Sequence, residues 1–147
     1  MRHLTLFVFI LLCFVACKTT SDNLKEKAKE EIAQTEKDFE KMTAEKGIKD
    51  AFTFYADSNV VVKGQNDSLI KGRDGISNLY GLPSFKNVSL KWSPDFIDAS
   101  EDGTLGYSYG KYVWQSKDST GKLNEFKGVF HTVWKRQNDG SWKYVWD

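Results

Sequence analysis

The sequence predicts an α+β domain in which helices pack on one face of a curved antiparallel sheet. Apolar residues recur at helical spacing in the first third of the chain, between Ala28 and Tyr55. Strand-like segments separated by turn sequences fill the remainder, from Asn59 onward. Three glycines fall inside these segments, where they favour a sheet that bends sharply or is closely approached. Helices followed by a run of hairpins are typical of this class.

The first residues are typical of a secretory signal. A basic start precedes an apolar run from Leu4 to Ala16. A run of about 13 residues rises only about 20 Å as a helix, which is too short for a bilayer core of about 30 Å. We therefore expect residues 1–16 to be a cleaved signal peptide that takes no part in the fold.

The junction Phe14-Val15-Ala16-Cys17 resembles a lipobox, in which a small residue precedes a cysteine that receives lipid. The resemblance implies that Cys17 anchors the mature protein to a membrane of the bacterial cell envelope. It would face either the periplasm or the outside. The polar residues up to Asn23 would then form a tether, so that 17–23 precedes a single domain at 24–147. The alternative is an ordinary secretory signal in which Cys17 has no special role.

Composition excludes several classes of site in the mature chain. With Cys13 in the predicted signal and Cys17 lipidated, no thiol remains for a disulfide, a metal or a nucleophile. One histidine and scattered carboxylates do not make a zinc or iron site. Basic and acidic residues balance at 20 each once Arg2 is removed, so a surface for nucleic acid is not expected. We expect neither a metal nor a cofactor.

Two helices are predicted first. The apolar face of the first helix is formed by residues spaced three and four apart: Ala28, Ile32, Thr35, Phe39 and Met42. Gly47 is typical of a helix stop. The apolar pattern of residues 48–55 then predicts a second, short helix with one buried side.

Strand candidates follow, separated by turn sequences rich in Asp, Asn and Gly. They are 59–64 with a short return at 69–70, then 88–100, 105–115, 126–136 and 142–147. A brief helical stretch from Gly72 to Gly81 interrupts them, and Pro83 prevents its continuation. Pro94, inside a strand candidate, predicts a bulge or an edge position.

A symmetric hairpin around the turn at 118–121 sets the register of the two longest strands. It places Gly110 opposite Phe130 and Gly128 opposite Tyr112. Pairing a small residue with an aromatic one suits a strongly coiled sheet.

Short motifs occur in a consistent order between Glu31 and Asp147. They are Gly47-Ile48-x-x-Ala51-Phe52, Tyr55-Ala56-Asp57, Lys71-Gly72-Arg73-x-x-Ile76, Trp92-x-Pro94, Gly103-x-Leu105-Gly106-Tyr107-x-x-Gly110-x-Tyr112 and Val133-Trp134-Lys135-Arg136-x-x-Asp139-Gly140-x-Trp142-Lys143. Together they resemble the nuclear transport factor 2-like superfamily, in the branch of ketosteroid isomerases and SnoaL-like polyketide cyclases. The resemblance implies a cone-shaped sheet wrapped around helices, an apolar cavity at one end and a dimer through the sheet. It implies little about activity, because this fold hosts enzymes and binding proteins alike.

A row of three polar side chains is the first candidate site: Tyr109, His131 and Asp147. The long hairpin pairs Tyr109 with His131, and a three-residue loop at 138–140 would pair His131 with Asp147. Such a row could supply a proton donor, a titratable base and an orienting carboxylate. A two-residue turn would instead place Asp147 on the other face. A structural network or an interface would explain the same residues.

Further candidate pocket residues come from the second helix and the aromatic positions. Asp57 falls where the resembling enzymes place polar pocket groups, although a helix-exit turn explains it equally well. Aromatic side chains could line a cavity for a flat or apolar ligand, with most of them being ordinary core: Tyr55, Tyr80, Trp92, Trp114, Trp134 and Trp146. The carboxylate, tyrosine and protonated acid of the ketosteroid isomerases cannot be placed on this sequence.

Three functions remain open. The first is an envelope-anchored domain that binds a small apolar or aromatic molecule in its cone without assigned catalysis. The second is a cofactor-free isomerase, dehydratase or cyclase that uses a pocket carboxylate or His131. The third is a protein-interaction module, and a homodimer fits all three. Binding is favoured because no acid and base pair can be identified from the sequence.

Overall fold

The computed structural model describes residues 2–118 and 120–147, with side chains from residue 23 onward except that of Gln65. Its helices are α1 (Arg2–Lys46), α2 (Ile48–Tyr55), α3 (Gly72–Tyr80) and the 3₁₀ turns η1 (Gln65–Asp67) and η2 (Pro83–Phe85). Its strands are β1 (Ala56–Lys63), β2 (Leu69–Lys71), β3 (Val88–Ala99), β4 (Leu105–Lys117), β5 (Leu123–Arg136) and β6 (Trp142–Trp146). They form one six-stranded sheet in the order β2-β1-β6-β5-β4-β3, which confirms the α+β prediction.

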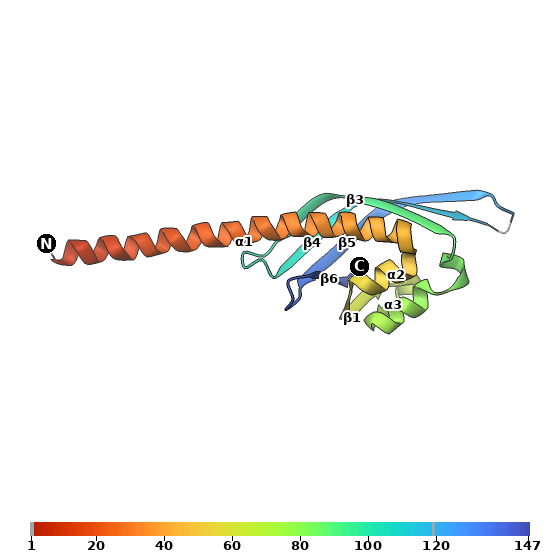
Figure 1. Cartoon of the computed structure of the whole chain (residues 1–147), viewed down its shortest axis with the longest axis horizontal. Coiled ribbons are helices and arrows are strands. Elements are labelled where there is room, and N and C mark those ends of the chain that lie inside the picture. The colour runs from red at the N-terminus through yellow and green to blue at the C-terminus, as the bar shows by residue number, and fades with distance from the viewer. Residues whose placement is uncertain (1, 119) are drawn as a thin grey trace.

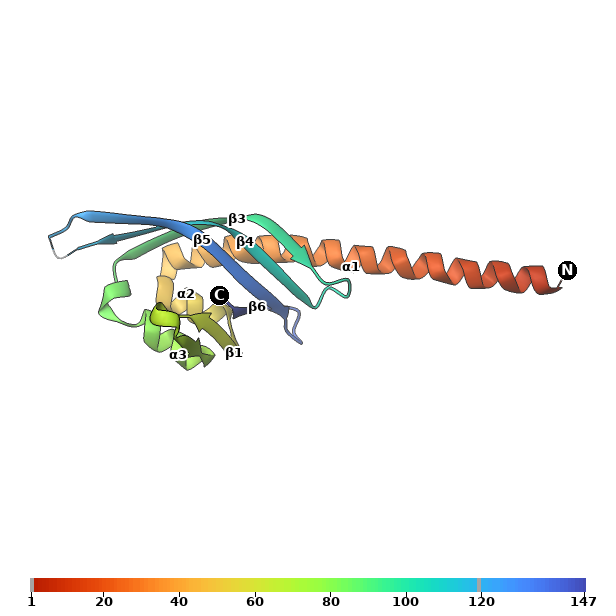
Figure 2. The same ribbon diagram turned by 180° about the vertical axis from the view of Figure 1, so that it is seen from behind.

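The sheet curves over the second half of α1, while α2 and α3 lie near its β1 side (Figure 1). Figure 2 shows the same arrangement from behind, with the first half of α1 projecting beyond the sheet. Every buried apolar residue of the described core lies between Ala28 and Tyr144. The described apolar core therefore lies within the predicted domain at 24–147.

The helix α1 continues without a break through the residues predicted as a signal and a tether. The side chains of the predicted signal and of Cys17 lie outside the described residues. No helix in the described part of the chain combines the length and hydropathy needed to cross a membrane.

The buried face of α1 differs from the predicted one. The fully buried positions follow each other at spacings of four, four, three and four: Ala28, Ile32, Glu36, Phe39 and Thr43. Thr35 and Met42, which the apolar pattern favoured, are only half-buried. The helix ends at Lys46 because Gly47 adopts a φ of 86°, a conformation that residues with a side chain avoid.

The central hairpin has the predicted register. Gly110 pairs with Phe130, and Tyr112 pairs with Gly128. A Cβ atom at Gly110 would lie 2.2 Å from the carbonyl oxygen of Ser93 on β3, so the two strands approach more closely than a side chain permits. At this point β3 is an edge strand with a register shift after Pro94, as predicted.

The hairpin between β5 and β6 begins in the predicted register and then shifts. Arg136 pairs with Trp142 and Trp134 pairs with Tyr144, but Val133 pairs with Trp146. One extra residue of β6 is therefore accommodated near its end, which is the geometry of a β-bulge. Because side chains alternate between faces, this bulge reverses the face on which the next residue lies.

Candidate functional site

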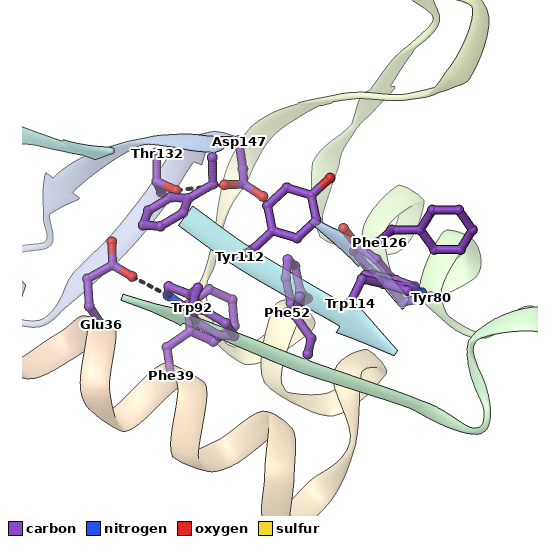
Figure 3. Close-up of a pocket in the computed structure, with 12 residues that line it drawn as sticks. Glu36, Phe39, Phe52, Tyr80, Trp92, Tyr112, Trp114, Phe126, Thr132 and Asp147 are labelled. Carbon is purple, nitrogen blue, oxygen red and sulfur yellow. Dashed lines mark hydrogen bonds between the residues drawn. The ribbon is translucent and has the colours of Figure 1, made fainter. Parts of the chain in front are cut away.

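The concave face of the sheet and the three α-helices enclose a cavity of about 430 Å³ (Figure 3). Eight of its twelve lining residues carry aromatic rings, and the others are one leucine, one threonine and two acids. The lining residues are Glu36, Phe39, Phe52, Tyr80, Leu90, Trp92, Tyr112, Trp114, Phe126, Phe130, Thr132 and Asp147. The cavity falls within the range of about 300–1,000 Å³ that is usual for small-molecule sites.

Inward-facing residues of β4 change from three small ones to two large aromatic ones along the strand, and this change shapes the cavity. They are Gly106, Ser108, Gly110, Tyr112 and Trp114. A Cβ atom at Gly106 would lie 2.4 Å from the side chain of Ile32, so the small residues are needed where α1 packs on the strand. The rings of Tyr112 and Trp114 lie further along β4, beyond this contact with α1, and they line the cavity.

Phe39 forms the floor of the cavity at the centre of an aromatic cluster. Its ring centroid lies 4.7 Å from that of Phe52 and 4.9 Å from that of Trp92, and it stacks on Tyr144 at 5.9 Å. Rings in edge-to-face contact are more favourable than area alone predicts. This cluster fixes the position of α1 relative to the sheet.

Glu36 is a buried acid with an exposed fraction of only 2%. Its carboxyl group accepts hydrogen bonds from the indole Nε1 atoms of Trp92 (2.7 Å) and Trp134 (3.0 Å) and from the hydroxyl of Ser108. Burial raises the pKa of Glu36, while these three donors act in the opposite direction. All three polar side chains therefore find their partner at one carboxyl group in the apolar interior.

Asp147 is the second acid of the cavity. The hydroxyl of Thr132 donates to its Oδ1 atom at 2.6 Å (Figure 3). Burial raises the pKa of Asp147 to about 6, and the negative charge of Glu36 adds to this effect. Thr132 is the only hydrogen-bond donor to this carboxyl group in the described part of the chain.

Tyr80, from α3, completes the wall beside the acids. Its ring packs between Phe52 and Phe85, with centroid distances of 4.5 Å and 5.1 Å. Burial raises the pKa of the Tyr80 phenol, and the charge of Asp147 raises it further. The phenol is therefore neutral at physiological pH and remains able to donate a hydrogen bond.

Of the residues proposed from the sequence, four line the cavity: Tyr80, Trp92, Trp114 and Asp147. Tyr55 does not line it but packs behind it, with its ring centroid 4.7 Å from that of Phe39. Asp57 is buried outside the cavity, where it accepts hydrogen bonds from the backbone of the second residue after it and from a glutamine side chain. These hydrogen bonds hold the pKa of Asp57 below its ordinary value and fit the helix-exit interpretation.

The row of Tyr109, His131 and Asp147 is not formed. Tyr109 and His131 are cross-strand neighbours as predicted, but both are exposed on the convex face of the sheet. The bulge in β6 moves Asp147 beside Thr132 on the concave face, where it enters the cavity. The prediction that His131 pairs with Asp147 is therefore wrong, because one inserted residue reverses the face.

Sequence reasoning missed Glu36, although a signal was present. Glu36 follows Ile32 by four residues and precedes Phe39 by three, so it occupies a position on the buried stripe of α1. A charged residue at such a position is informative, since acids are almost never fully buried without partners. Ser108 and Thr132 lie in phase with the inward-facing glycines, which was a weaker signal of the same kind.

The two acids do not form a metal site with other side chains. Among the described residues, no group of three or more His, Cys, Asp or Glu side chains lies close enough to hold a metal ion. The lining residues offer two carboxyl groups, three hydroxyl groups on Tyr80, Tyr112 and Thr132, and a set of ring faces.

No protein-family model and no curated protein matches the sequence. Solved structures do match. One is a nuclear transport factor 2-like superfamily protein from Salmonella enterica serovar Typhimurium LT2, at a TM-score of 0.67 and 16% identity, covering 82% of this chain and 88% of that protein. This chain has the nuclear transport factor 2-like fold.

Two further structures show how widely the nuclear transport factor 2-like fold is used. A ketosteroid isomerase-like protein from Erwinia carotovora atroseptica SCRI1043 matches at a TM-score of 0.63 and 12% identity, covering 78% of this chain and 88% of that one. The association domain of CaMKII from C. elegans matches at 0.63 and 14% identity, covering 82% and 93%. At these identities the likeness shows a common fold, and the activity has to be argued from the cavity.

Proposed function

We propose that the domain binds a small, largely apolar and aromatic molecule inside the cone. The observation that carries the proposal is a cavity of about 430 Å³ in which eight of twelve lining residues are aromatic. Transfer of apolar surface from water into such a site stabilises a complex by about 25 cal/mol per Å². Flat ligands gain additional stacking and edge contacts with the rings. The acids at Glu36 and Asp147 would orient the polar end of the ligand.

Cofactor-free proton transfer is the second candidate, and Asp147 is the observation that favours it. Its carboxyl group lines an apolar cavity, is held by Thr132 and has a pKa raised to about 6 by burial. A pKa near the working pH is what general acid and base catalysis requires. His131 cannot take this role in the same cavity, because it lies on the opposite face of the sheet.

The cavity-bearing domain would be held at a membrane of the cell envelope through lipidated Cys17. The lipobox-like junction at 14–17 supports this part of the proposal. With residues 1–16 removed, residues 17–23 would remain as the link between the lipid and the domain that begins at 24. The ligand site would then remain accessible while the chain is anchored.

We also propose a homodimer through the convex face of the sheet. Large apolar side chains are exposed there: Phe96 (42%), Tyr107 (36%), Tyr109 (41%) and Val129 (73%). The rings of Phe96 and Tyr109 already stack at a centroid distance of 5.2 Å. An exposed apolar patch on adjacent strands is typical of an interface. The match to a domain named for association supports the proposal.

A thermal-shift screen of the segment Lys18–Asp147 tests the binding proposal. The panel contains sterols, aromatic acids, polyketide-like rings and lipids. A ligand present at 100 times its dissociation constant stabilises the folded state by about 2.7 kcal/mol, which is measurable as a higher melting temperature. We expect at least one compound to stabilise the domain reproducibly.

Two matched variants locate the binding. Leu90→Trp fills the cavity, whereas Ser89→Trp adds the same ring at the preceding, exposed position of β3. The stabilisation should disappear in Leu90→Trp and persist in Ser89→Trp, provided that both melt cooperatively without ligand. A panel with no hit, or a hit unaffected by Leu90→Trp, would contradict the proposal. Turnover of a hit that Asp147→Asn abolishes, with binding retained, would favour the enzymatic candidate.

A further inference from the structure

The charge inside the cavity has one sign. Two of the twelve lining residues, Glu36 and Asp147, are acids, and none of the twelve is Lys, Arg or His. The other lining residues are eight with aromatic rings, one leucine and one threonine. An anionic ligand would therefore meet two acids and no counter-charge, which makes carboxylates and phosphates poor ligands.

The two acids differ in the number of hydrogen bonds that their carboxyl groups accept from the protein. Glu36 receives three hydrogen bonds from Ser108, Trp92 and Trp134. Asp147 receives one, from Thr132 to Oδ1, and the described part of the chain supplies no donor to its Oδ2 atom. Buried charged groups are ordinarily paired or fully hydrogen-bonded. Asp147 is half-buried and lines the cavity, so a donor on the ligand is in a position to reach its second oxygen.

The rings around the acids suit the same kind of partner. Tyr80, Tyr112 and Trp114 line the cavity together with Asp147. In Figure 3 the Asp147 carboxyl group projects between Thr132 and the ring of Tyr112. The faces of tyrosine and tryptophan rings carry negative electrostatic potential and attract cations, above all organic ammonium groups. The carboxylate and the ring faces thus both favour a cationic ligand.

The geometry points to an organic cation as the ligand: an ammonium group that pairs with the Asp147 carboxylate, on an aromatic or apolar body held among the rings. This inference rests on the proposed binding function and names the chemical class of its ligand. A bare metal ion does not fit the same position, since the described residues provide no third ligand and the remaining walls are apolar. The body of the ligand is needed to fill the apolar volume.

Three compounds of nearly equal shape and different charge test the inference: tryptamine (cation), tryptophol (neutral) and indole-3-acetate (anion). Their affinities for the segment Lys18–Asp147 are measured by isothermal titration calorimetry at neutral pH. We expect tryptamine to bind at least about tenfold more tightly than tryptophol, as one charge-assisted hydrogen bond would give, with indole-3-acetate the weakest. In Asp147→Asn the preference for tryptamine over tryptophol should vanish while tryptophol binding is retained.

The control variant is Asp95→Asn, which removes the same charge from an exposed position on β3 outside the cavity. It should keep the preference for the cation. Tryptophol binding as tightly as tryptamine would overturn the inference and leave the proposed function supported. A preference for tryptamine that survives Asp147→Asn would also overturn it. If none of the three binds, the inference fails, and the thermal-shift panel of neutral compounds decides separately on the proposed function.

Discussion

Ser108 and Thr132 are cross-strand partners on the concave face of the sheet, and each donates its hydroxyl hydrogen to a different acid. Ser108 donates to Glu36, and Thr132 donates to Asp147. Both hydroxyl-bearing residues are buried, with exposed fractions of 0% and 4%. One register position of the β4–β5 ladder therefore supplies a hydroxyl donor to each of the two acids of the cavity. On the inward face, Ser108 lies between Gly106 and Gly110 of β4, and Thr132 lies between Phe130 and Trp134 of β5.

Removing the buried acid of α1 should destabilise the fold. Glu36→Met fits the volume but leaves the indole N–H of Trp92 and the hydroxyl of Ser108 without their acceptor, whereas the indole N–H of Trp134 keeps the Ser108 hydroxyl oxygen at 3.1 Å. Each buried unsatisfied donor costs about 1–3 kcal/mol, so we expect the free energy of unfolding in urea to fall by about 2–5 kcal/mol. Glu30→Met, at an exposed position of the same helix, is the control and should leave the stability nearly unchanged. Equal effects of the two variants would contradict the structural role of Glu36.

The stability of the domain should depend on pH through Asp147. Its folded-state pKa is about 6, whereas an unfolded aspartate has a pKa of about 3.9. Between these values the folded state binds more protons than the unfolded state, so stability falls as the pH rises from about 4 to about 6. Three groups face this carboxyl group. The charge of Glu36 from α1 raises its pKa, and the hydrogen bond from Thr132 of β5 lowers it. The third is the phenol of Tyr80 from α3.

The substitution Asp147→Asn isolates this effect. The variant should melt at a higher temperature than the wild type at pH 7.5, and the two should converge near pH 4. The measurement is a series of thermal melts across that range, with exposed Asp95→Asn as the reference. A constant difference between Asp147→Asn and the wild type at all pH values would show that Asp147 does not titrate in this window.

Two glycines of the central hairpin should respond differently to alanine. At Gly110 the new Cβ would meet backbone atoms of β3, 2.2 Å from the carbonyl oxygen of Ser93, and the strands cannot separate cheaply. At Gly128 it would meet the ring of Tyr112 at 2.6 Å, and that ring can move into the cavity. We expect Gly110→Ala to cost about 3 kcal/mol and Gly128→Ala about 1 kcal/mol in urea unfolding. Gly128→Ala should also weaken ligand binding, and a reversed order of stabilities would contradict this geometry.

The membrane anchor makes a separate prediction. If Cys17 receives lipid, Cys17→Ser should yield an unprocessed or soluble product in cells that otherwise localise the protein to membranes. Cys13→Ser, four residues earlier in the predicted signal, is the matched control and should be processed normally. Membrane fractionation and mass spectrometry of the N-terminus measure both outcomes. A Cys17→Ser variant that is still processed and membrane-bound would exclude lipid anchoring at this position.

The elements and the central register could be predicted because their signals are local. The turn at 118–121, the glycines opposite aromatic residues and the break at Gly47 each act over a few residues. Such signals are set by backbone conformation and side-chain volume. The bounds of α2 and the bulge after Pro94 followed from the same kind of reasoning.

The site was harder to predict because its decisive features depend on distant contacts. β6 pairs with β5 on one side and in parallel with β1 on the other, and Asp147 is held there by backbone hydrogen bonds with Val61 and Lys63. This pairing accompanies the bulge that brings Asp147 into the cavity, and no glycine or proline in β6 signals it. The burial of Glu36 likewise depends on Ser108 and Trp134, more than 70 positions away in the chain.

The most direct test of the central claim is an NMR titration of the ¹⁵N-labelled segment Lys18–Asp147 with unlabelled tryptamine and tryptophol. The indole N–H signals of the tryptophans report on different places. Trp92 and Trp114 line the cavity, whereas Trp142 donates to Glu31 outside it, at 3.0 Å. Binding in the cone predicts saturable shifts of the Trp92 and Trp114 signals with Trp142 unchanged. Saturable shifts confined to Trp142 or to residues of the convex face, or no saturable shift with either compound, would contradict the account.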